Sequence, residues 1–439
     1  MIARLPTLKS SLAGEKMLKD VENAVKGAKN KDLLIYVHIP FCSSKCAFCD
    51  WVADIPVSQL TGAAGLSDRY VEALCKQIRS YGPHLTKIGY TPKFIYWGGG
   101  TPSKLDAEQV ARIIEALRES FDLSALEQHA METSPETLTQ EKLNRLRALG
   151  VERLSMGVQS FIDKELRHAG RSHSAAQAVE AARMIKRAGF DNFNLDLIAA
   201  LPGQTMESFE QSVRQVIELE TPHVSVYVYR PDPRTVMAQQ SVAGFRERVH
   251  REKMMETYLR AKEMFEAAGY HEYATFYFAK ERKHYFSGEM YYFELQGDYV
   301  GFGAGAYSIM GHRFLKNQSE LHAFIENPVD FEYCEVFTPA RPDKQLSFLM
   351  SAAVLTEMGI NYERFARIAG FPFAAIRRHP YMEVLMQYYV DCGSTFQETR
   401  EGLKVQPETR STAHINHLAG IYEAKLLHYS NARAQAERV

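Results

Sequence analysis

Short β-rich runs alternate with longer, charged segments of helical pattern between about residues 31 and 230 of this 439-residue chain. The predicted strands are 33–39, 94–97, 130–133, 153–158, 192–198 and 224–229, and the helices between them lie near 67–81, 106–120, 139–149, 174–189 and 206–220. This alternation predicts an α/β fold of parallel strands joined by right-handed helical crossovers. The carboxyl ends of all the strands then lie on one side, where such folds place their sites.

Several predicted helices open with a residue that can cap the first turn, namely Ser67, Asp106, Thr139 and Ser174. After residue 233 the pattern changes to a long amphipathic helix near 246–268, an aromatic segment and a glycine-rich stretch at 299–308. From about residue 330, helices near 343–357, 361–369 and 379–391, a wing at 394–405 and a final helix from about 409 resemble a small winged-helix domain. We therefore predict an N-terminal extension (1–30), a partial (β/α)6 barrel (31–240), an extension that closes the barrel mouth (241–330) and a C-terminal winged-helix-like α+β domain (331–439).

The charge balance excludes a general attraction to nucleic acid or to an anionic membrane. Lysine and arginine number 52 against 53 aspartate and glutamate residues, a net charge of -1. The longest apolar stretches have the length of a strand, far below the roughly 20 residues of a membrane span. We expect a cytoplasmic protein with no nucleic-acid or membrane partner.

Three of the six cysteines, Cys42, Cys46 and Cys49, lie within eight residues directly after the first strand. A structural zinc ion takes four ligands, and only His38 is near enough in sequence to supply a fourth. An iron–sulfur cluster is normally held by four cysteines, so three would leave one iron open to a ligand. Zinc through His38, and a loop of thiols without any ligand, are the alternatives.

Further motifs follow the predicted strands and should meet at the same mouth. They are Gly98-Gly99-Gly100-Thr101-Pro102 after the second strand, Glu132 in METSPE, Gln159 in MGVQS, Arg171 in AGRSHS, and Asp196 and Ile198 in NLDLIAALPGQ. A carboxylate suits ribose hydroxyls, and the planar guanidinium of arginine suits a carboxylate ligand. A tight turn at the glycines, a capping role for Glu132 and an exposed Arg171 are the structural alternatives.

The run HIPFCSSKCAFC resembles the signature of the radical S-adenosylmethionine (SAM) superfamily. The resemblance implies that Cys42, Cys46 and Cys49 hold a [4Fe–4S] cluster whose fourth iron is chelated by SAM, with Phe48 beside the adenine. It also implies that the backbone of Gly98, Gly99 and Gly100 receives the SAM ammonium. Polar SAM contacts would come from Glu132, Gln159, Arg171 and Asp196, and Ile198 would join them.

HIPFC, GGGTP, RLSMGVQSF, NLDLIAALPGQT and GDYVGFGAGAYS are similar to the HemN-like branch of that superfamily, over roughly residues 31–430. The branch includes oxygen-independent coproporphyrinogen III oxidase, the related heme chaperone, anaerobic heme-degrading enzymes and class C methyltransferases. The oxidases have Gly-Cys-Asn after the last cysteine, where this chain has Asp50-Trp51-Val52. The chaperones usually have Cys and His in the glycine loop, where this chain has Gly303-Ala304-Gly305-Ala306-Tyr307.

These departures, with the Cys-Asp-Trp-Val continuation and the chain length, favour a class C methyltransferase. Two SAM molecules would bind, one cleaved to a 5′-deoxyadenosyl radical and the other donating a methyl or methylene group to an sp2 carbon of a natural-product-like acceptor. Thr101 would contact the second SAM. The expected partners are a small unsaturated or aromatic acceptor and an electron donor such as flavodoxin or ferredoxin. The alternatives are a tetrapyrrole enzyme, either coproporphyrinogen III oxidation or heme degradation, and a heme chaperone.

No catalytic base can be assigned by spacing. Tyr277, Tyr273, Glu272 and Tyr307 lie in segments that should cap the barrel mouth. Buried tyrosines are more often core residues whose hydroxyl has a partner. The catalytic residues therefore stay unassigned at this level.

Overall fold

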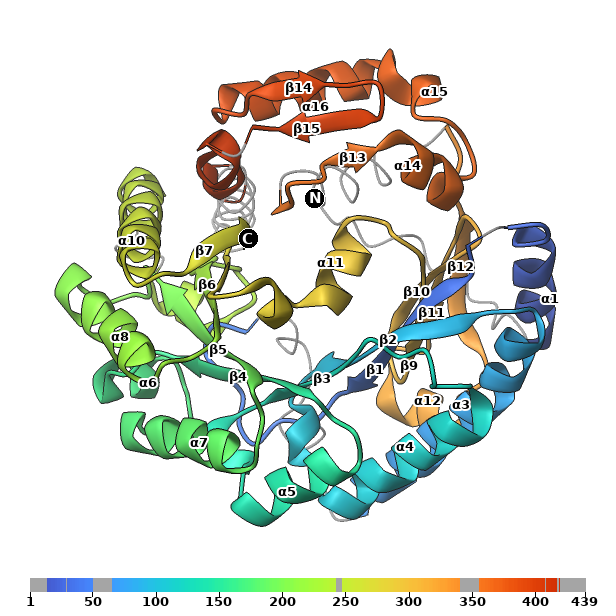
Figure 1. Cartoon of the computed structure of the whole chain (residues 1–439), viewed down its shortest axis with the longest axis horizontal. Helices are drawn as coiled ribbons and strands as arrows, with labels where there is room; N and C mark the ends of the chain where they lie inside the picture. The colour runs from blue at the N-terminus through green and yellow to red at the C-terminus, as the bar shows by residue number, and fades with distance from the viewer. Residues whose placement is uncertain are drawn as a thin grey trace, which may run out of the picture.

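Twelve strands form one sheet in the computed structural model, which describes residues 14–28, 30–49, 65–241, 247–339, 355–406, 408–416 and 418. Six neighbouring strands are parallel and follow chain order: β1 (Asp32–Ile39), β2 (Thr91–Gly99), β3 (Gln128–Thr133), β4 (Arg153–Gln159), β5 (Asn192–Ala199) and β6 (His223–Val228). Figure 1 shows them curving around a common centre with helices on the outside. The predicted α/β fold with a parallel sheet is confirmed.

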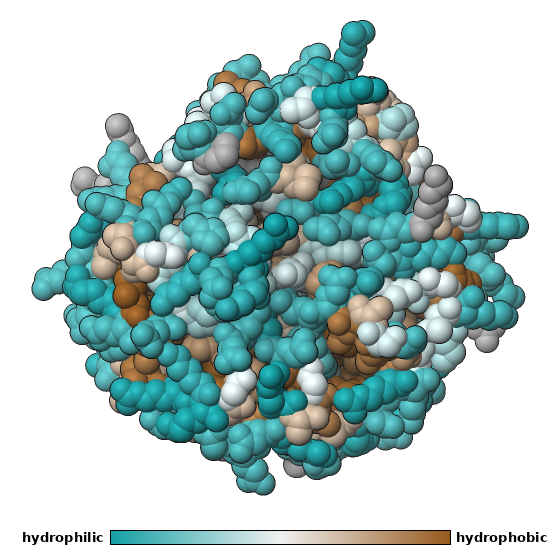
Figure 2. Space-filling view, viewed as in Figure 1, coloured by the Kyte–Doolittle hydropathy of each residue, from teal (hydrophilic) through white to brown (hydrophobic). Residues whose placement is uncertain are grey.

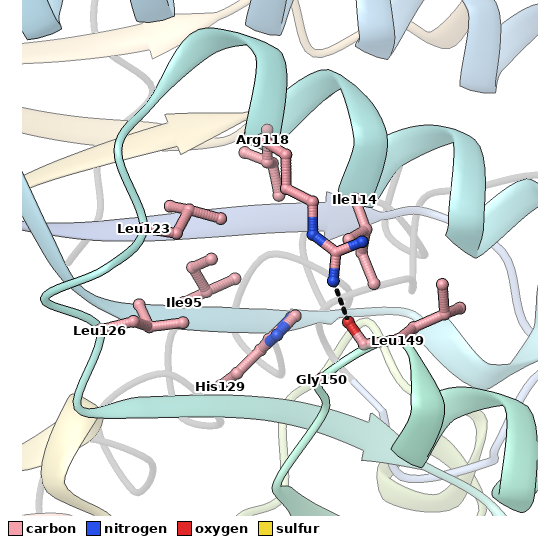
Figure 3. A pocket seen from close by; sticks show the side chains of 9 residues that line it. Ile95, Ile114, Arg118, Leu123, Leu126, His129, Leu149 and Gly150 are labelled. Atoms are coloured by element: carbon pink, nitrogen blue, oxygen red, sulfur yellow. Dashed lines mark hydrogen bonds between the residues drawn. The ribbon is translucent and has the colours of Figure 1, made fainter.

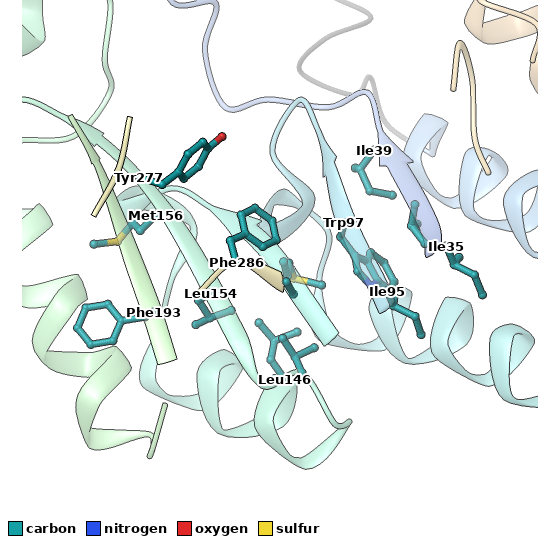
Figure 4. Packing of buried hydrophobic residues seen from close by; sticks show 14 of the residues in the cluster. Ile35, Ile39, Ile95, Trp97, Leu146, Leu154, Met156, Phe193, Tyr277 and Phe286 are labelled. Carbon is teal, nitrogen blue, oxygen red and sulfur yellow. The ribbon is translucent and has the colours of Figure 1, made fainter. Parts of the chain in front are cut away.

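The connecting helices cover the outer face of the sheet. They are α3 (Leu66–Lys87), α4 (Ala107–Ser120), α5 (Gln140–Ala148), α6 (Asp163–His168), α7 (Ala175–Arg187) and α8 (Met206–Glu218). Alternate strand residues such as Leu154, Met156 and Val158 are fully buried against these helices. Figure 4 shows part of this packing, including Ile95 and Trp97 from β2. The remaining strand residues therefore face the inside of the barrel, because side chains alternate along a strand.

Three of the four predicted helix caps are confirmed. Asp106 and Ser174 each form a capping box with the glutamine three residues later, and Thr139 accepts a hydrogen bond from the Lys142 backbone N–H at 3.2 Å. Ser67 was the wrong choice, since α3 already begins at Leu66 after a glycine with a φ of 77°. The Ser67 hydroxyl instead accepts a hydrogen bond from the α4 side.

The segment after β6 extends the sheet at both of its edges. Helix α10 (Glu247–Ala267) leads to β7 (His271–Ala274) and β8 (Tyr277–Ala279), and β8 pairs antiparallel with β6. Helix α11 (Ser287–Phe293) then lies on the inner side of the curved sheet (Figure 1), and β9 (Asp298–Phe302) pairs parallel with β1. Three further strands complete that edge: β10 (Tyr307–Met310), β11 (Arg313–Asn317) and β12 (Phe331–Val336). The strand β12 thus joins the large sheet although it lies past residue 330, where we placed the domain boundary.

The C-terminal part has its own three-stranded sheet of β13 (Ile360–Asn361), β15 (Gly402–Val405) and β14 (Phe396–Glu398). Helices α14 (Tyr362–Ala369), α15 (Ala374–Arg377) and α16 (Pro380–Asp391) pack on it around a separate apolar cluster. The helices predicted at 361–369 and 379–391 and the wing are thus present, and the one predicted at 343–357 lies almost entirely outside the described residues. The domain boundaries themselves stay predictions.

Shorter helices complete the molecule: α1 (Gly14–Ala24), α9 (Val236–Ser241) and α12 (Leu321–Glu326). None of the helices that the structure describes is both long and apolar enough to cross a lipid bilayer. On the face shown in Figure 2, hydrophilic side chains dominate and the apolar ones form small, separate groups.

Candidate cluster and SAM site

The cysteine loop is held at the carboxyl end of β1 by backbone contacts from distant parts of the chain. The Ala47 N–H donates to the Ala169 carbonyl at 2.9 Å, and the Met237 N–H donates to the Ala47 carbonyl at the same distance. Gly170 has a φ of 71°, and a Cβ there would lie 3.0 Å from the Ala47 nitrogen. Only glycine lets the chain pass this closely behind the loop.

The glycine triplet that ends β2 lies against the cysteine loop so closely that no side chain would fit. A Cβ at Gly99 would lie 2.5 Å from the His38 ring, and one at Gly100 would lie 3.0 Å from the Cys42 sulfur. Gly99 also has a φ of 111°, which other residues rarely adopt. A Cβ at Gly98 would lie 3.2 Å from the Glu132 carboxyl carbon. The triplet therefore offers bare backbone beside the cysteines and the Glu132 carboxyl.

Two polar side chains approach the cysteine sulfurs. The Thr101 hydroxyl donates to Cys42 Sγ at 3.5 Å, and Arg171 Nη1 donates to Cys46 Sγ at 3.2 Å. Burial raises the pKa of Cys42 to about 11, so without a metal this thiol keeps its proton. Iron binding displaces the proton because the thiolate is the ligand. The contact with Cys42 places Thr101 beside the cluster loop, and its predicted role toward a second SAM stays untested.

Two further groups hold the Arg171 side chain in place. Its Nη2 donates to the Ser134 hydroxyl at 2.7 Å and to the Gly157 carbonyl at 2.6 Å. Its Nε is buried and has no hydrogen-bond partner among the described residues. An unsatisfied guanidinium N–H beside the cysteine loop fits the carboxylate that the SAM resemblance assigns to Arg171.

Two carboxyl groups face the barrel interior below the glycine triplet. Glu132 accepts a hydrogen bond from the Tyr96 hydroxyl, and Asp196 accepts one from Asn194 Nδ2 at 2.7 Å. Burial, reinforced by their mutual repulsion, raises the pKa of Glu132 to about 8, and burial raises that of Asp196 to about 6. Both carboxyls are thus poised to accept hydroxyl donors or to face a positive charge.

Phe48, the predicted adenine contact, and Ile198, a further predicted SAM contact, lie together in a small apolar cluster. Ile198 is buried there with Leu201, Tyr229 and Met237, and Phe48 packs on the cluster while remaining half-buried. Such a surface can take the flat face of an adenine ring.

Gln159 occupies a strained position at the end of β4. Its φ is 75°, and its side-chain nitrogen would lie 2.9 Å from a Cβ placed at Gly157. Backbone strain of this kind persists where the surrounding structure enforces it, often at a binding site.

The described residues do not support the zinc alternative. No three His, Cys, Asp or Glu side chains in the described part of the chain converge on one point, as a single metal ion requires. In a [4Fe–4S] cluster each thiolate binds its own iron, so the three sulfurs need not converge. His38 is instead hydrogen-bonded to the Tyr36 hydroxyl at 3.1 Å, and burial lowers the pKa of His38 to about 4.

The four residues considered as catalytic bases lie in different environments. Glu272 is held on the outside of the barrel by Lys262 Nζ at 2.7 Å and Ser411 Oγ at 2.6 Å. Tyr273 is hydrogen-bonded to His223 and stacks on another tyrosine, and Tyr307 is 41% exposed. Only Tyr277 faces the barrel interior, where its hydroxyl lies 3.3 Å from that of Tyr227.

The sequence analysis did not identify two interior residues, Glu289 on α11 and Arg153 at the start of β4. Electrostatic interactions connect Glu289 with Asp196 and Arg153 across the barrel. Glu289 follows no motif, and its only sequence signal is a carboxyl group inside the aromatic run 285–293.

A separate hollow of about 250 Å³ lies between α4 and strands β2 and β3, on the outer side of the sheet. Figure 3 shows Arg118 donating to the Leu149 carbonyl across it, at 2.9 Å, with His129 alongside. Its other lining residues are mainly isoleucine and leucine, and it contains none of the predicted site residues.

These features define a class of protein: a parallel α/β barrel that places a three-cysteine loop next to a glycine triplet at the carboxyl ends of its first two strands. A family model described as the radical SAM superfamily matches residues 36–216. The heme chaperone HemW of Bacillus subtilis (strain 168) is 32% identical over 348 residues, which cover 76% of this chain and 86% of the relative. The chain belongs to the HemN-like branch of the radical SAM superfamily.

Two further similarities agree with this assignment. Oxygen-independent coproporphyrinogen III oxidase of Salmonella typhimurium (strain LT2) is 30% identical over 321 residues, covering 69% of this chain and 67% of the relative. The solved structure of coproporphyrinogen III oxidase (HemN) from Escherichia coli matches with a TM-score of 0.73 and 24% identity, covering 94% of this chain and 95% of that one. Membership in the superfamily implies one [4Fe–4S] cluster and SAM.

The relatives contradict the expected methyl or methylene transfer. They are named heme chaperones and coproporphyrinogen oxidases, and nothing among them supports natural-product C-methylation or cyclopropanation. The prediction was wrong, and it relied on chain length, on Asp50, Trp51 and Val52, and on the lack of Cys and His in the glycine loop 303–307. Asp50, Trp51 and Val52 lie outside the described part of the chain.

Proposed function

We propose that this chain is a radical SAM protein of tetrapyrrole metabolism and that it binds heme in the manner of a heme chaperone. The observation that carries the proposal is the identity of 32–33% to two heme chaperones, over 73% and 86% of their lengths. The cluster and SAM site supports it, because the cysteines, the glycine triplet and the interior carboxyls lie together.

Each part of the site has a defined task in this proposal. Cys42, Cys46 and Cys49 hold the cluster, which when bound supplies the electron for reductive SAM cleavage. Arg171 binds the SAM carboxylate through its Nε, which has no partner among the described residues. Glu132 and Asp196 accept hydrogen bonds from the other polar hydrogens of SAM. The apolar cluster around Ile198 and Phe48 excludes water from the adenine side.

Three further elements belong to the proposal. We propose one SAM per chain, and equilibrium binding with cluster-loaded protein would reveal a second. An electron-transfer protein such as flavodoxin or ferredoxin would reduce the cluster. A cytoplasmic location agrees with the six cysteines, none of which forms a disulfide in the described part of the chain.

A second candidate is oxidation of a porphyrinogen side chain. It is supported by the extent of the match to the HemN structure, 94% of this chain, and by the carboxyl groups enclosed in the barrel. An enclosed polar interior suits a substrate that must react away from water.

Heme titration of the anaerobically reconstituted protein tests the leading proposal. A chaperone should bind heme stoichiometrically with a shifted Soret band. The same protein, given dithionite, SAM and coproporphyrinogen III, should form 5′-deoxyadenosine and a decarboxylated tetrapyrrole if the second candidate holds. Neither heme binding nor turnover by a cluster-loaded protein would refute both.

A further inference from the structure

The Arg171 guanidinium is linked to the carboxylate of Glu136 through a single hydroxyl group. Arg171 Nη2 donates to the Ser134 hydroxyl at 2.7 Å, and that hydroxyl donates in turn to Glu136 Oε2. Ser134 is buried, and Glu136 is half-buried in the short 3-10 helix Pro135–Thr137. A hydroxyl has only one hydrogen, so with that hydrogen directed at Glu136 the oxygen of Ser134 is left to accept from Arg171.

Glu136 is held in its charged form by its neighbours. Burial would raise the pKa of this carboxyl, but the contacts with His173 and Ser134 and the charge of Arg171 outweigh burial and lower the pKa to about 2. His173 Nδ1 lies 3.5 Å from Glu136 Oε2, at ion-pair distance, and the His173 side chain is completely buried. The carboxylate therefore lies between the Arg171 guanidinium and the His173 ring.

Both ring nitrogens of His173 face an acceptor. Nε2 lies 3.2 Å from the Val158 carbonyl oxygen, and Nδ1, which has no hydrogen-bond partner among the described residues, faces the Glu136 carboxylate. A neutral imidazole has one N–H group and one lone pair, and either choice would aim the lone pair at an oxygen. The arrangement is favourable when both nitrogens carry protons, and His173 is then the counter-charge of Glu136.

The end of β4 supplies the carbonyl groups that hold both side chains. The pairing of β4 with β5 shifts register between Gly157 and Gln159, and Gln159 has a φ of 75°. At this irregularity the Gly157 carbonyl accepts from Arg171 Nη2 at 2.6 Å, and the Val158 carbonyl faces His173. Bulges of this kind redirect groups beside binding sites, and here two successive carbonyls face two basic side chains.

We propose that Glu136 and His173 are positioning residues for Arg171 and that they thereby set the affinity for the SAM carboxylate. Glu136 fixes the Ser134 hydroxyl in the orientation that accepts from Arg171. His173 balances the Glu136 charge, so the charge of Arg171 stays available to a ligand at Nε, which has no partner among the described residues. Without His173, Arg171 would be left to balance the Glu136 carboxylate. The inference rests on the proposed function in that it takes SAM to be the ligand of Arg171.

A double-mutant cycle tests this balance of charges. In cluster-loaded protein, His173→Gln should weaken SAM binding about tenfold, because Arg171 then has to balance Glu136. Glu136→Gln alone should change the dissociation constant by less than about threefold, since its amide oxygen can still accept from Ser134. The two substitutions together should bind SAM within about threefold of the unmodified protein. A double variant as weak as His173→Gln alone, or weaker, would refute the proposed pairing.

Decarboxylated SAM distinguishes the positioning of Arg171 from a general effect on the fold. This ligand keeps the adenosine, the sulfonium and the amine but has no carboxylate for Arg171. Ser134→Ala should weaken SAM binding about fivefold, because Arg171 loses one of the bonds that orient it. Neither Ser134→Ala nor His173→Gln should change the affinity for decarboxylated SAM by more than about twofold. An equal loss for both ligands would show a structural effect and would overturn the inference.

Equilibrium dialysis with labelled ligand supplies these constants, with iron and sulfide content determined for every sample. Glu141→Gln is the control, because Glu141 is an exposed carboxylate in the first turn of α5, five residues after Glu136. Ser134→Ala takes the place of His173→Gln if the latter does not load the cluster. Normal SAM binding that His173→Gln and Ser134→Ala both leave unchanged would refute this inference alone. Cluster-loaded, unmodified protein that binds no SAM would refute the SAM site of the proposed function itself.

Discussion

Replacing Arg171 by alanine should weaken SAM binding by about 1.5–3 kcal/mol, which corresponds to a dissociation constant roughly 10 to 150 times higher. Arg171 places one guanidinium edge against Cys46 Sγ at 3.2 Å and leaves its buried Nε without a partner among the described residues. A SAM carboxylate that accepts from Arg171 Nε would form a charge-assisted hydrogen bond, and the alanine variant would lose it.

The magnitude follows from the surroundings of Arg171. Burial alone would lower its pKa, but the cysteine sulfurs and Glu136 outweigh that effect and keep the guanidinium charged. The bonds to Ser134 Oγ and the Gly157 carbonyl, at 2.7 and 2.6 Å, also fix its orientation before SAM arrives. Little entropy is therefore lost when the ligand bond forms, and the upper half of the range is the better estimate.

Anaerobic equilibrium dialysis with labelled SAM measures this loss, with iron and sulfide content determined for each sample. Arg167→Ala is the matched control, since Arg167 is an exposed arginine at the end of α6, four residues before Arg171. Arg171→Lys should recover part of the affinity, because it keeps the charge but not the planar fork. An unchanged dissociation constant for Arg171→Ala at full cluster content would remove Arg171 from the SAM site.

Four further outcomes are expected. Cys42→Ala should abolish the visible absorbance of the cluster and SAM cleavage, whereas Cys75→Ala, at a buried thiol beneath α4, should retain both in the same assays. Gly99→Ala should keep the cluster but lose SAM binding in dialysis, because the new Cβ would lie 2.5 Å from the His38 ring. Arg367→Ala should increase hydrogen exchange at residues 287–297 without loss of the cluster, since Arg367 Nη2 donates to the Leu295 carbonyl at 2.8 Å, just past the end of α11. Thermal stability of the ligand-free protein should fall between about pH 5 and pH 8, because burial raises the pKa of Glu132 from 4.5 to about 8. In this range the folded state holds a proton that the unfolded state releases. Glu132→Gln should flatten this decline in a thermal-melting series.

The positions of the six parallel strands could be predicted because they depend on local sequence patterns. Apolar β-branched runs and capping residues such as Asp106 act over a few residues, and the structure places both where the sequence indicates. The strand ends were less predictable. The second strand was expected at 94–97, the part that pairs with β3, but it spans Thr91–Gly99 because pairing with β1 extends it through residues of low strand preference.

The polar interior of the barrel could be predicted only in part. Glu132 and Asp196 follow strands and belong to motifs, whereas Glu289 lies on a seven-residue helix with no periodic pattern of its own. Arg153 donates to the His284 carbonyl, 131 residues further along the chain, and no local pattern marks that contact. Contacts of this range depend on the whole fold, so local sequence patterns do not reveal them.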